Sequence, residues 1–296
     1  MNLGVLLGRA GTAGDSLDAA SALDTLLQNI ITSSAIEGEH LNAASVRSSL
    51  ARRLGISLDG ATNAPTSSRT EGLAELMMDA VQNTHTSLSL ERLLNWHRWL
   101  FPDDEPRLVS IRVGQLRGQE PMQVVSGRLD KPKIHYEAPP RDQLDAELNR
   151  FIAWFNQSNT PALDPLLRAA ITHFWFITLH PFDDGNGRIT RALTDLALAQ
   201  ADAQSIRLYA MSSAILANRN GYYEILERSQ TGDMNITSWL EWFLQTLNNT
   251  LLQALAGIAR VLRKRLFWQQ FQQQNFSAEQ RKVLNRLLDG GERGFE

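Results

Sequence analysis

Twelve consecutive residues, His180 to Arg191, contain the side chains that a phosphate-handling site needs. Glycines on both sides of Asn186 allow backbone N–H groups to approach an anion, and a helix that begins there adds the positive end of its dipole. Arg188 and Arg191 are three residues apart, so they share a helix face and can bind several phosphate oxygens. The spacing therefore predicts an anion-binding turn between two helices.

Two more side chains of this segment could supply proton and metal chemistry. His180 can accept a proton near neutral pH. Asp184 offers a hard oxygen ligand, and Mg²⁺ commonly takes one carboxylate together with phosphate oxygens. These groups together predict the transfer of a phosphate-bearing group from a nucleotide.

A calcium loop is the main alternative for an Asp- and Gly-containing turn. An EF-hand loop that starts at Asp183 requires Glu at its twelfth position, which is Thr194. A start at Asp184 puts Asp195 there and Arg188 at a ligand position, so we reject this interpretation.

The elements that must position this segment are helices. Asp164 and Pro165 predict a helix start, from which an apolar stripe leads to His180. Pro181 interrupts that helix, and another begins around Asn186. The apolar face of the second helix recurs at helical spacing: Ile189, Leu193 and Leu196.

Most of the remaining chain is also predicted to be helical, including residues 144–155 and 236–256. Residues 123–136 have the pattern of a short β-hairpin. Residues 56–72 are rich in Ser, Thr, Gly, Asn and Pro, and we expect a loop or linker there. The predicted class is all-α with one short hairpin.

The segment from His180 to Arg191 resembles the signature of the Fic family, HPFx(D/E)GNGRxxR, at every specified position. Fic enzymes share an α-helical core and typically transfer AMP from ATP to a Ser, Thr or Tyr hydroxyl of a target protein. The resemblance covers roughly Ile31 to Gln253. It implies a helical Fic core with a hairpin flap, plus an N-terminal helical region.

By this resemblance, His180 would be the catalytic base that deprotonates the hydroxyl, and Asp184 would hold Mg²⁺. Arg188 and Arg191 would orient the β- and γ-phosphates. The anion hole at the α-phosphate would be formed by Gly185, Asn186 and Gly187. Doc-type kinases, which transfer phosphate, have Lys where this chain has Gly187, so glycine there favours adenylyl transfer.

Residues 33–38, with the sequence SSAIEG, resemble the inhibitory motif (S/T)xxxE(G/N) of Fic proteins whose inhibitory helix precedes the core. Ser33 and Glu37 lie on one helix face, and Gly38 ends that helix. In the family this glutamate pairs with the second arginine of the signature, here Arg191, and blocks the productive γ-phosphate position. An ordinary helix C-terminus is the alternative for this short motif.

Two weaker resemblances complete the nucleotide site. Residues 123–127 lie where the family has its flap, which suggests as nucleotide-binding residues Val124, Val125, Ser126 and Gly127. Tyr222 and Tyr223 match an aromatic pair beside the adenine pocket, whereas Gln230 falls where relatives often have Asn, so its base contact is open. A plain hairpin and ordinary core packing are the alternatives.

The other histidines receive no catalytic role. His97 and His173 lie on apolar helical stretches and are predicted to belong to the core or to an interface, and His135 has no partner that the sequence identifies. Tyr136 is a guess for a self-modification site.

Composition restricts location and partners. The chain has 296 residues, Lys+Arg 29, Asp+Glu 32 and a net charge of −3, so nothing marks it as a nucleic-acid or membrane-surface binder. The absence of cysteine excludes disulfides and thiolate sites, and it fits the cytoplasmic location that we expect. The stretch 242–259 lacks charges but holds too many polar groups for a membrane span.

We expect three regions: residues 1–105, a helical region with the inhibitory motif; residues 106–260, the Fic core; and residues 261–296, a helical tail that resembles the start of a winged-helix domain. The basic stretch 260–265 raises the alternative of a DNA-binding regulator. Because the chain ends before any recognition helix, we expect no DNA binding.

The sequence thus predicts an adenylyltransferase with ATP, Mg²⁺ and a hydroxyl-bearing target protein, for which the chain itself is a candidate. Glu37 is predicted to restrain it from within the nucleotide site by pairing with Arg191. Removal of AMP from a modified protein, with Glu37 positioning the attacking water, is the alternative reaction. A homodimer is allowed but not required.

Overall fold

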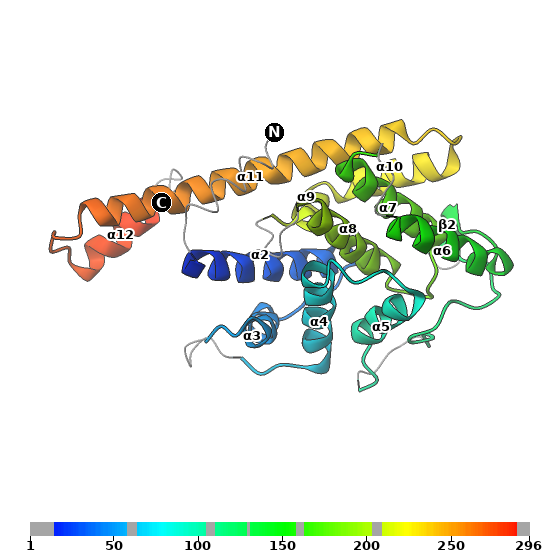
Figure 1. Cartoon of the computed structure of the whole chain (residues 1–296), viewed down its shortest axis with the longest axis horizontal. Helices are drawn as coiled ribbons and strands as arrows, with labels where there is room; N and C mark the ends of the chain where they lie inside the picture. The colour runs from blue at the N-terminus through cyan, green and yellow to red at the C-terminus, as the bar shows by residue number, and fades with distance from the viewer. Residues whose placement is uncertain are drawn as a thin grey trace.

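The computed structural model describes residues 15–57, 64–104, 110–128, 131–157, 163–202 and 209–288, and Figure 1 shows their arrangement. The elements in chain order are α2 (Asp15–Ile36), α3 (Ala43–Leu54), α4 (Ser68–Gln82), α5 (Leu90–Leu100), β1 (Gln123–Arg128), β2 (Lys131–Glu137), α6 (Arg141–Asn156), α7 (Pro165–Leu179), α8 (Asn186–Asp202), α9 (Met211–Ala217), α10 (Arg219–Thr231), α11 (Thr237–Gln270) and α12 (Ala278–Leu288). Helices with one antiparallel hairpin confirm the predicted fold class.

Helices α7 and α8 form the antiparallel pair that carries the signature. Asp164 caps α7, because its side chain accepts a hydrogen bond from Leu166 N at 2.8 Å, and Pro165 occupies the first helical position. Helix α7 ends before His180, and α8 begins at Asn186. Both predicted helix starts are therefore confirmed.

Helix α8 is the centre of the core. It contacts α2, α4, α5 and α7, and the predicted apolar face is fully buried: Ile189, Leu193 and Leu196. Helix α11 closes the core from the other side with Trp239 and Phe243. Because α8 is enclosed by helices on several sides, its N-terminus is held at a fixed place.

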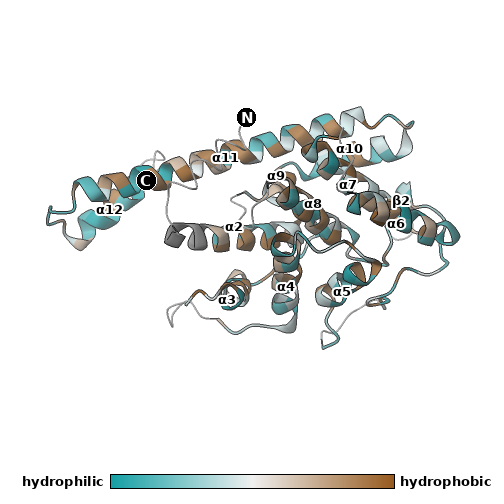
Figure 2. Cartoon of the chain, viewed as in Figure 1, coloured by the Kyte–Doolittle hydropathy of each residue, from teal (hydrophilic) through white to brown (hydrophobic). Residues whose placement is uncertain are grey.

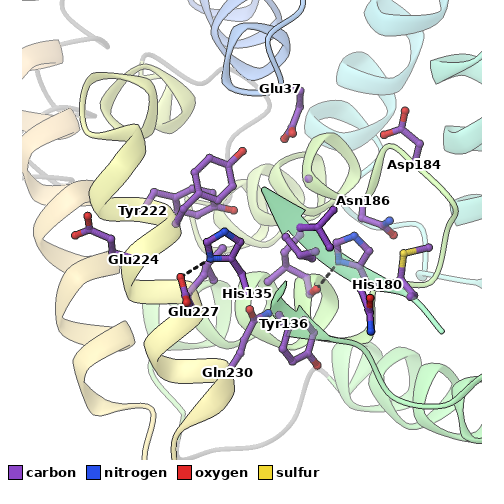
Figure 3. A pocket seen from close by; sticks show the side chains of 18 of the residues that line it. Glu37, His135, Tyr136, His180, Asp184, Asn186, Tyr222, Glu224, Glu227 and Gln230 are labelled. Carbon is purple, nitrogen blue, oxygen red and sulfur yellow. Dashed lines mark hydrogen bonds and ion pairs between the residues drawn. The ribbon is translucent and has the colours of Figure 1, made fainter. Parts of the chain in front are cut away.

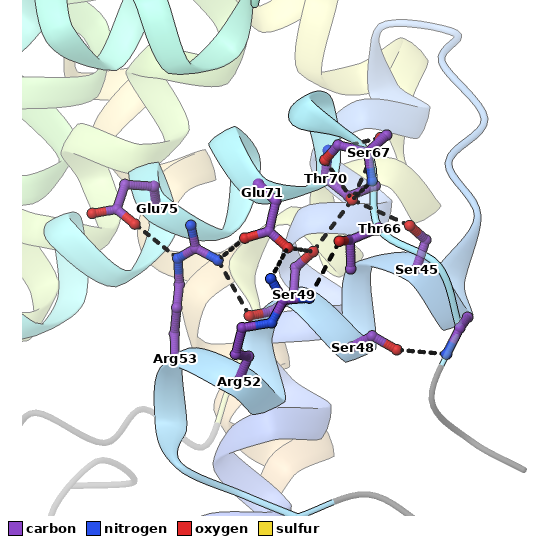
Figure 4. A network of polar contacts seen from close by, with 11 residues as sticks. Ser45, Ser48, Ser49, Arg52, Arg53, Thr66, Ser67, Thr70, Glu71 and Glu75 are labelled. Carbon is purple, nitrogen blue, oxygen red and sulfur yellow. Dashed lines mark hydrogen bonds and ion pairs between the residues drawn. The ribbon is translucent and has the colours of Figure 1, made fainter. Parts of the chain in front are cut away.

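Helices α3 and α4 are joined by the polar network in Figure 4. Ser49 Oγ donates to Glu71 Oε1 at 2.8 Å, and Arg53 Nε donates to Glu75 Oε2 at 2.8 Å. The predicted loop of residues 56–72 is wrong at its end, because α4 begins at Ser68. The Ser/Thr-rich sequence there is a helix cap, since Ser67 accepts from Thr70 N. Residues 58–63 lie outside the described part of the chain.

Helix α11 is longer than the predicted stretch 236–256, since it continues to Gln270 and carries the basic residues 260–265 within it. Its second half extends away from the core and pairs with α12, and Figure 2 shows apolar residues along this extension. Ser277 caps α12, because its Oγ accepts from Gln280 N at 3.2 Å. No helix in the described residues is long and apolar enough to cross a bilayer.

The hairpin forms over residues 123–137, close to the predicted range. Strand β1 pairs with β2 in the register Gln123–Glu137, with an irregularity between Val124 and Val125. Strand β2 contacts α10, and the hydroxyl of Tyr136 donates to Thr178 O of α7 at 2.9 Å. The hairpin is thus held against the α7–α8 pair.

Candidate active site

A cavity of about 710 Å³ lies between the α7–α8 turn, the hairpin, α10 and the C-terminal end of α2 (Figure 3). The turn contributes predicted site residues His180, Asp184, Gly185, Asn186 and Gly187. The other elements contribute Glu37, Val124, Val125, Tyr222 and Gln230. Arg188 and Arg191 are buried beneath the cavity wall. The side-chain surroundings of Ser126 and Gly127 lie outside the described residues.

His180 has a geometry that frees one ring nitrogen. It caps α7 in the left-handed conformation, with φ 48° and ψ 58°. Its Nδ1 lies 3.1 Å from Ile177 O, and a carbonyl can only accept, so Nδ1 carries the proton and Nε2 has a free lone pair. Burial lowers the pKa of His180, which keeps the ring neutral at pH 7.

The turn after His180 is closed by Asn186. Its Oδ1 accepts from Phe182 N at 3.0 Å, and its Nδ2 donates to Phe182 O at 2.8 Å. Gly185 has φ 80°, and a Cβ there would lie 2.6 Å from Leu100 Cδ2, so this position requires glycine. The first N–H groups of α8 have no partner within the helix, which makes this cavity wall suited to an anion.

Asp184 lies at the edge of the cavity with its side chain 56% exposed. Its Oδ1 accepts from Gly185 N at 2.5 Å and lies 3.7 Å from Arg188 Nη2. Among the described residues, no group of three or more His, Cys, Asp or Glu side chains could hold a metal ion. A single carboxylate beside an anion-binding turn fits a Mg²⁺ ion shared with phosphate oxygens.

Residues 33–38 contact the second arginine of the signature. Arg191, 3% exposed, donates from Nε to Ser33 Oγ at 2.8 Å and from Nη2 to Glu37 Oε1 at 2.7 Å. Burial alone would raise the pKa of Glu37, but the Arg191 guanidinium outweighs it and holds that pKa below its ordinary value. Gly38, with φ 81°, follows directly after this contact.

Gly187 makes room for this carboxylate. A Cβ built on Gly187 would lie 2.2 Å from Glu37 Oε1 and 3.2 Å from Arg191 Nη1. Any larger residue at position 187 would therefore displace Glu37 or Arg191. The Nη1 of Arg191 is buried and has no hydrogen-bond partner among the described residues.

Sequence reasoning missed a second carboxylate at the arginines. Glu39 Oε2 accepts from Arg188 Nη1 at 2.8 Å, and Glu39 also pairs with Arg69 of α4. The Arg188 guanidinium lies 5.1 Å from the centroid of the Phe101 ring, and burial lowers its pKa to about 10. An acidic residue two positions after Glu37 was the only sequence signal for this contact.

A cluster at the other end of the cavity was also missed. His135 Nδ1 of β2 lies 2.6 Å from Glu227 Oε2 of α10 (Figure 3), and Lys133 Nζ lies 3.3 Å from Glu227 Oε1. The same helix carries Gln230, whose Nε2 donates to Thr178 Oγ1 at 3.2 Å. The Glu227 contacts hold the hairpin against α10, and the Gln230 bond joins α10 to α7.

The two core histidines are buried as predicted. His173 hydrogen-bonds through Nε2 to the hydroxyl of Tyr222 at 2.9 Å, and burial lowers its pKa to about 3. His97 Nδ1 accepts from Gly114 N at 2.9 Å, so its Nε2 donates to Asp184 O at 3.2 Å. His97 therefore supports the turn from behind in its neutral form, with its pKa lowered by burial to about 4.

Residues 87–198 match the family model described as "Fic/DOC family", and residues 1–56 match "Domain of unknown function (DUF4172)". Among curated proteins, the chain is 28% identical over 150 residues to "Protein adenylyltransferase fic-1" of Caenorhabditis elegans, covering 51% of the chain and 26% of that protein. It is 25% identical over 229 residues to "Protein adenylyltransferase Fic" of Culex quinquefasciatus, covering 74% and 42%. The chain thus spans less than half the length of these relatives.

Solved structures show the same fold. A Fic family protein from Desulfovibrio desulfuricans G20 superposes with a TM-score of 0.61 at 21% identity, covering 86% of this chain and 72% of the other. A Fic domain containing signaling protein from Bacteroides thetaiotaomicron gives a TM-score of 0.63 at 19% identity, covering 87% and 95%. Residues 87–198 thus match the Fic/DOC family model, and the complete signature on its helical turn and this shared architecture agree with that match.

Proposed function

We propose that this chain is a protein adenylyltransferase that transfers AMP from ATP to a Ser, Thr or Tyr hydroxyl of a target protein. The observation that carries the proposal is a neutral His180, with Nε2 free, on the same cavity wall as the N-terminus of α8. The names of the curated relatives support the same activity.

In the proposed reaction, Nε2 of His180 accepts the proton of the target hydroxyl. The hydroxyl oxygen forms a bond to the α-phosphorus, the bond from that phosphorus to the bridging oxygen breaks, and pyrophosphate leaves. The N–H groups at residues 185–187 stabilise the charge that develops on the α-phosphate. Most of the rate comes from holding the three reacting groups in line.

Asp184 would hold a Mg²⁺ ion, which would neutralise charge on the phosphates when bound. The residue fits this role because its carboxylate is half exposed at the cavity edge, within reach of an anion on the α8 N-terminus. The chain's own residues perform the remaining tasks: the helix N-terminus binds the phosphates, and His180 moves the proton.

We further propose that Glu37 inhibits this activity. Its carboxylate binds the Arg191 guanidinium, which would otherwise bind the γ-phosphate. It also adds a negative charge beside the triphosphate. Removal of AMP, with Glu37 assisting a water molecule, takes second place. The carboxylate lines the cavity as that reaction needs, but its lowered pKa makes it a weak base.

Intact-mass analysis tests the proposal. The Glu37→Gly variant, incubated with ATP, Mg²⁺ and a panel of hydroxyl-bearing proteins, should add one AMP unit to itself or to a target. The same variant with His180→Ala is the matched control and should add none. ATP labelled at the α-phosphate separates the two reactions, because only the forward reaction deposits label. Failure of the Glu37→Gly variant to add AMP to any protein would refute the proposed activity.

A further inference from the structure

Arg117 is a buried arginine directly behind His180, and it is only 2% exposed. Its Nε donates to His180 O at 2.9 Å, and its backbone N–H donates to Pro181 O at 2.9 Å. Its Nη2 donates to Pro139 O, at the end of the hairpin. Nε, Nη2 and the backbone N–H of Arg117 thus all donate to backbone carbonyls.

These bonds hold a backbone conformation that a histidine rarely adopts. The left-handed conformation of His180 costs about 1 kcal/mol without compensating contacts. The carbonyls of His180 and Pro181 each accept a hydrogen bond from Arg117. These two bonds fix the orientation of the peptide group that follows His180. The bond from Nδ1 to Ile177 O then fixes the ring itself.

Arg117 also connects the base to the hairpin. Pro139 lies two residues after the end of β2, and Arg141 Nε donates back to Arg117 O at 2.9 Å. The end of the hairpin and the carbonyl of His180 are therefore held by one guanidinium. A shift of Arg117 would change the distance between the base and the strand that covers the cavity.

We propose that Arg117 is a positioning residue for the transfer reaction, which holds the imidazole of His180 and the end of the hairpin in the relative position that transfer needs. This inference rests on the proposed adenylyltransferase activity. The charge of Arg117 adds a second effect. Burial is the main cause of the lowered pKa of His180, and Arg117 lowers it further, whereas Glu37 and Asp184 favour protonation.

The test compares Arg117→Met and Arg117→Lys in the Glu37→Gly background. We expect Arg117→Met to lower kcat about 100-fold, the cost of a misplaced reacting group, while KM for ATP stays within about threefold. The acid limb of its pH–rate profile should move to higher pH, because a positive charge beside the imidazole is lost. Arg117→Lys keeps the charge, so the acid limb of its pH–rate profile should stay in place. Its kcat should be about a tenth of that of the Glu37→Gly parent.

The matched control is Arg168→Met. Arg168 is a half-buried arginine that also donates to a backbone carbonyl, that of Phe155, and it lies at the other end of α7. Its loss should lower the melting temperature as much as Arg117→Met and leave kcat and the pH profile unchanged. An unchanged kcat in folded Arg117→Lys and Arg117→Met would overturn the inference, and so would an equal loss in Arg168→Met. Failure of the Glu37→Gly background itself to transfer AMP would refute the proposed function instead.

An independent observation concerns Glu39. Its carboxylate binds Arg188, so both arginines of the signature are neutralised by carboxylates that follow α2. Arg69 and Arg188 meet on this one carboxylate. We infer that Glu39 is a second inhibitory carboxylate, because its removal would free the Arg188 guanidinium, which the proposed site assigns to the phosphates. This inference also depends on the proposed nucleotide site.

Calorimetry with a non-hydrolysable ATP analogue and Mg²⁺ tests this without requiring transfer. Glu39→Gln should bind the analogue about tenfold more tightly than the unmodified chain, the size of one charge-assisted hydrogen bond. Glu71→Gln is the control, since Glu71 also joins two arginines, Arg52 and Arg53, away from the cavity. Weaker or unchanged binding in Glu39→Gln would show that Glu39 only orients Arg188 and would overturn the inference. Absence of analogue binding in every variant, Glu37→Gly included, would refute the nucleotide site.

Discussion

Replacement of Glu37 by glutamine should lower the stability of the protein and raise its affinity for ATP. Glutamine keeps the shape and one acceptor but removes the charge that faces the buried Arg191. Breaking a fully buried ion pair costs about 3–5 kcal/mol. Because the Glu37 side chain is 32% exposed and Arg191 keeps both bonds to Ser33, we expect a loss of about 1–2 kcal/mol.

The same substitution should strengthen the binding of ATP. An Arg191 without a carboxylate partner can bind the γ-phosphate, so a non-hydrolysable ATP analogue should bind about tenfold more tightly. Saturating analogue at 100 times its Kd adds about 2.7 kcal/mol of stability, which offsets the loss from the substitution. Urea denaturation with and without the analogue measures both effects on one protein.

The pH dependence of folding stability tests whether the Glu37 charge is stabilising. The pKa of Glu37 is lower in the folded state than its ordinary value of 4.5, so its contribution to stability is present above pH 4.5 and is lost as pH falls through the folded-state pKa. The stability difference between the unmodified chain and Glu37→Gln should therefore disappear at acid pH. A Glu37→Gln variant of unchanged stability and unchanged analogue affinity at pH 7 would refute the argument.

Three further outcomes are expected. His180→Ala should lower transfer about 1,000-fold and leave ATP binding intact, and its residual rate should show no acid limb, unlike the parent, whose rate falls as pH drops through the lowered pKa of His180; radiolabel transfer measures the rate at each pH. Gly187→Ala should destabilise the chain by about 1–3 kcal/mol in thermal denaturation, because its Cβ meets the Glu37 carboxylate, and this cost should disappear in Glu37→Gly. Chelation of Mg²⁺ should stop transfer, and Asp184→Asn should raise the Mg²⁺ concentration needed for half-maximal rate; a rate unaffected by the chelator would remove the metal from the reaction.

The local features of the site were predictable from the sequence. Helix starts at Pro165 and Asn186, the break at His180 and the hairpin of residues 123–137 all depend on caps, prolines, glycines and short periodic patterns. Each of these signals lies within a few residues of the structure that it specifies. The signature of residues 180–191 also predicted the family, which hydrophobic periodicity alone does not indicate.

The contacts between distant segments were not predictable in the same way. Glu39 binds Arg188 from 149 positions away, and His135 meets Glu227 from 92 positions away. One sequence gives no measure of which helix end or strand face will meet which partner. The helix α11 was underestimated for a different reason, because its second half has no strong amphipathic pattern and carries a basic run that resembles a helix end.

If Glu37 inhibits the protein as proposed, the way α2 is anchored restricts how that inhibition can be released. Ile30 and Ile36 are buried in the main core, and Asn29 Nδ2 donates to Asp195 Oδ2 at 2.6 Å, one turn of α8 beyond Arg191. Withdrawal of the whole helix would expose that core, which costs as much as partial unfolding. Activation therefore has to occur on the scale of side-chain rotamers or a frayed last turn, and a partner that activates the protein needs to reach only the few residues after Ile36.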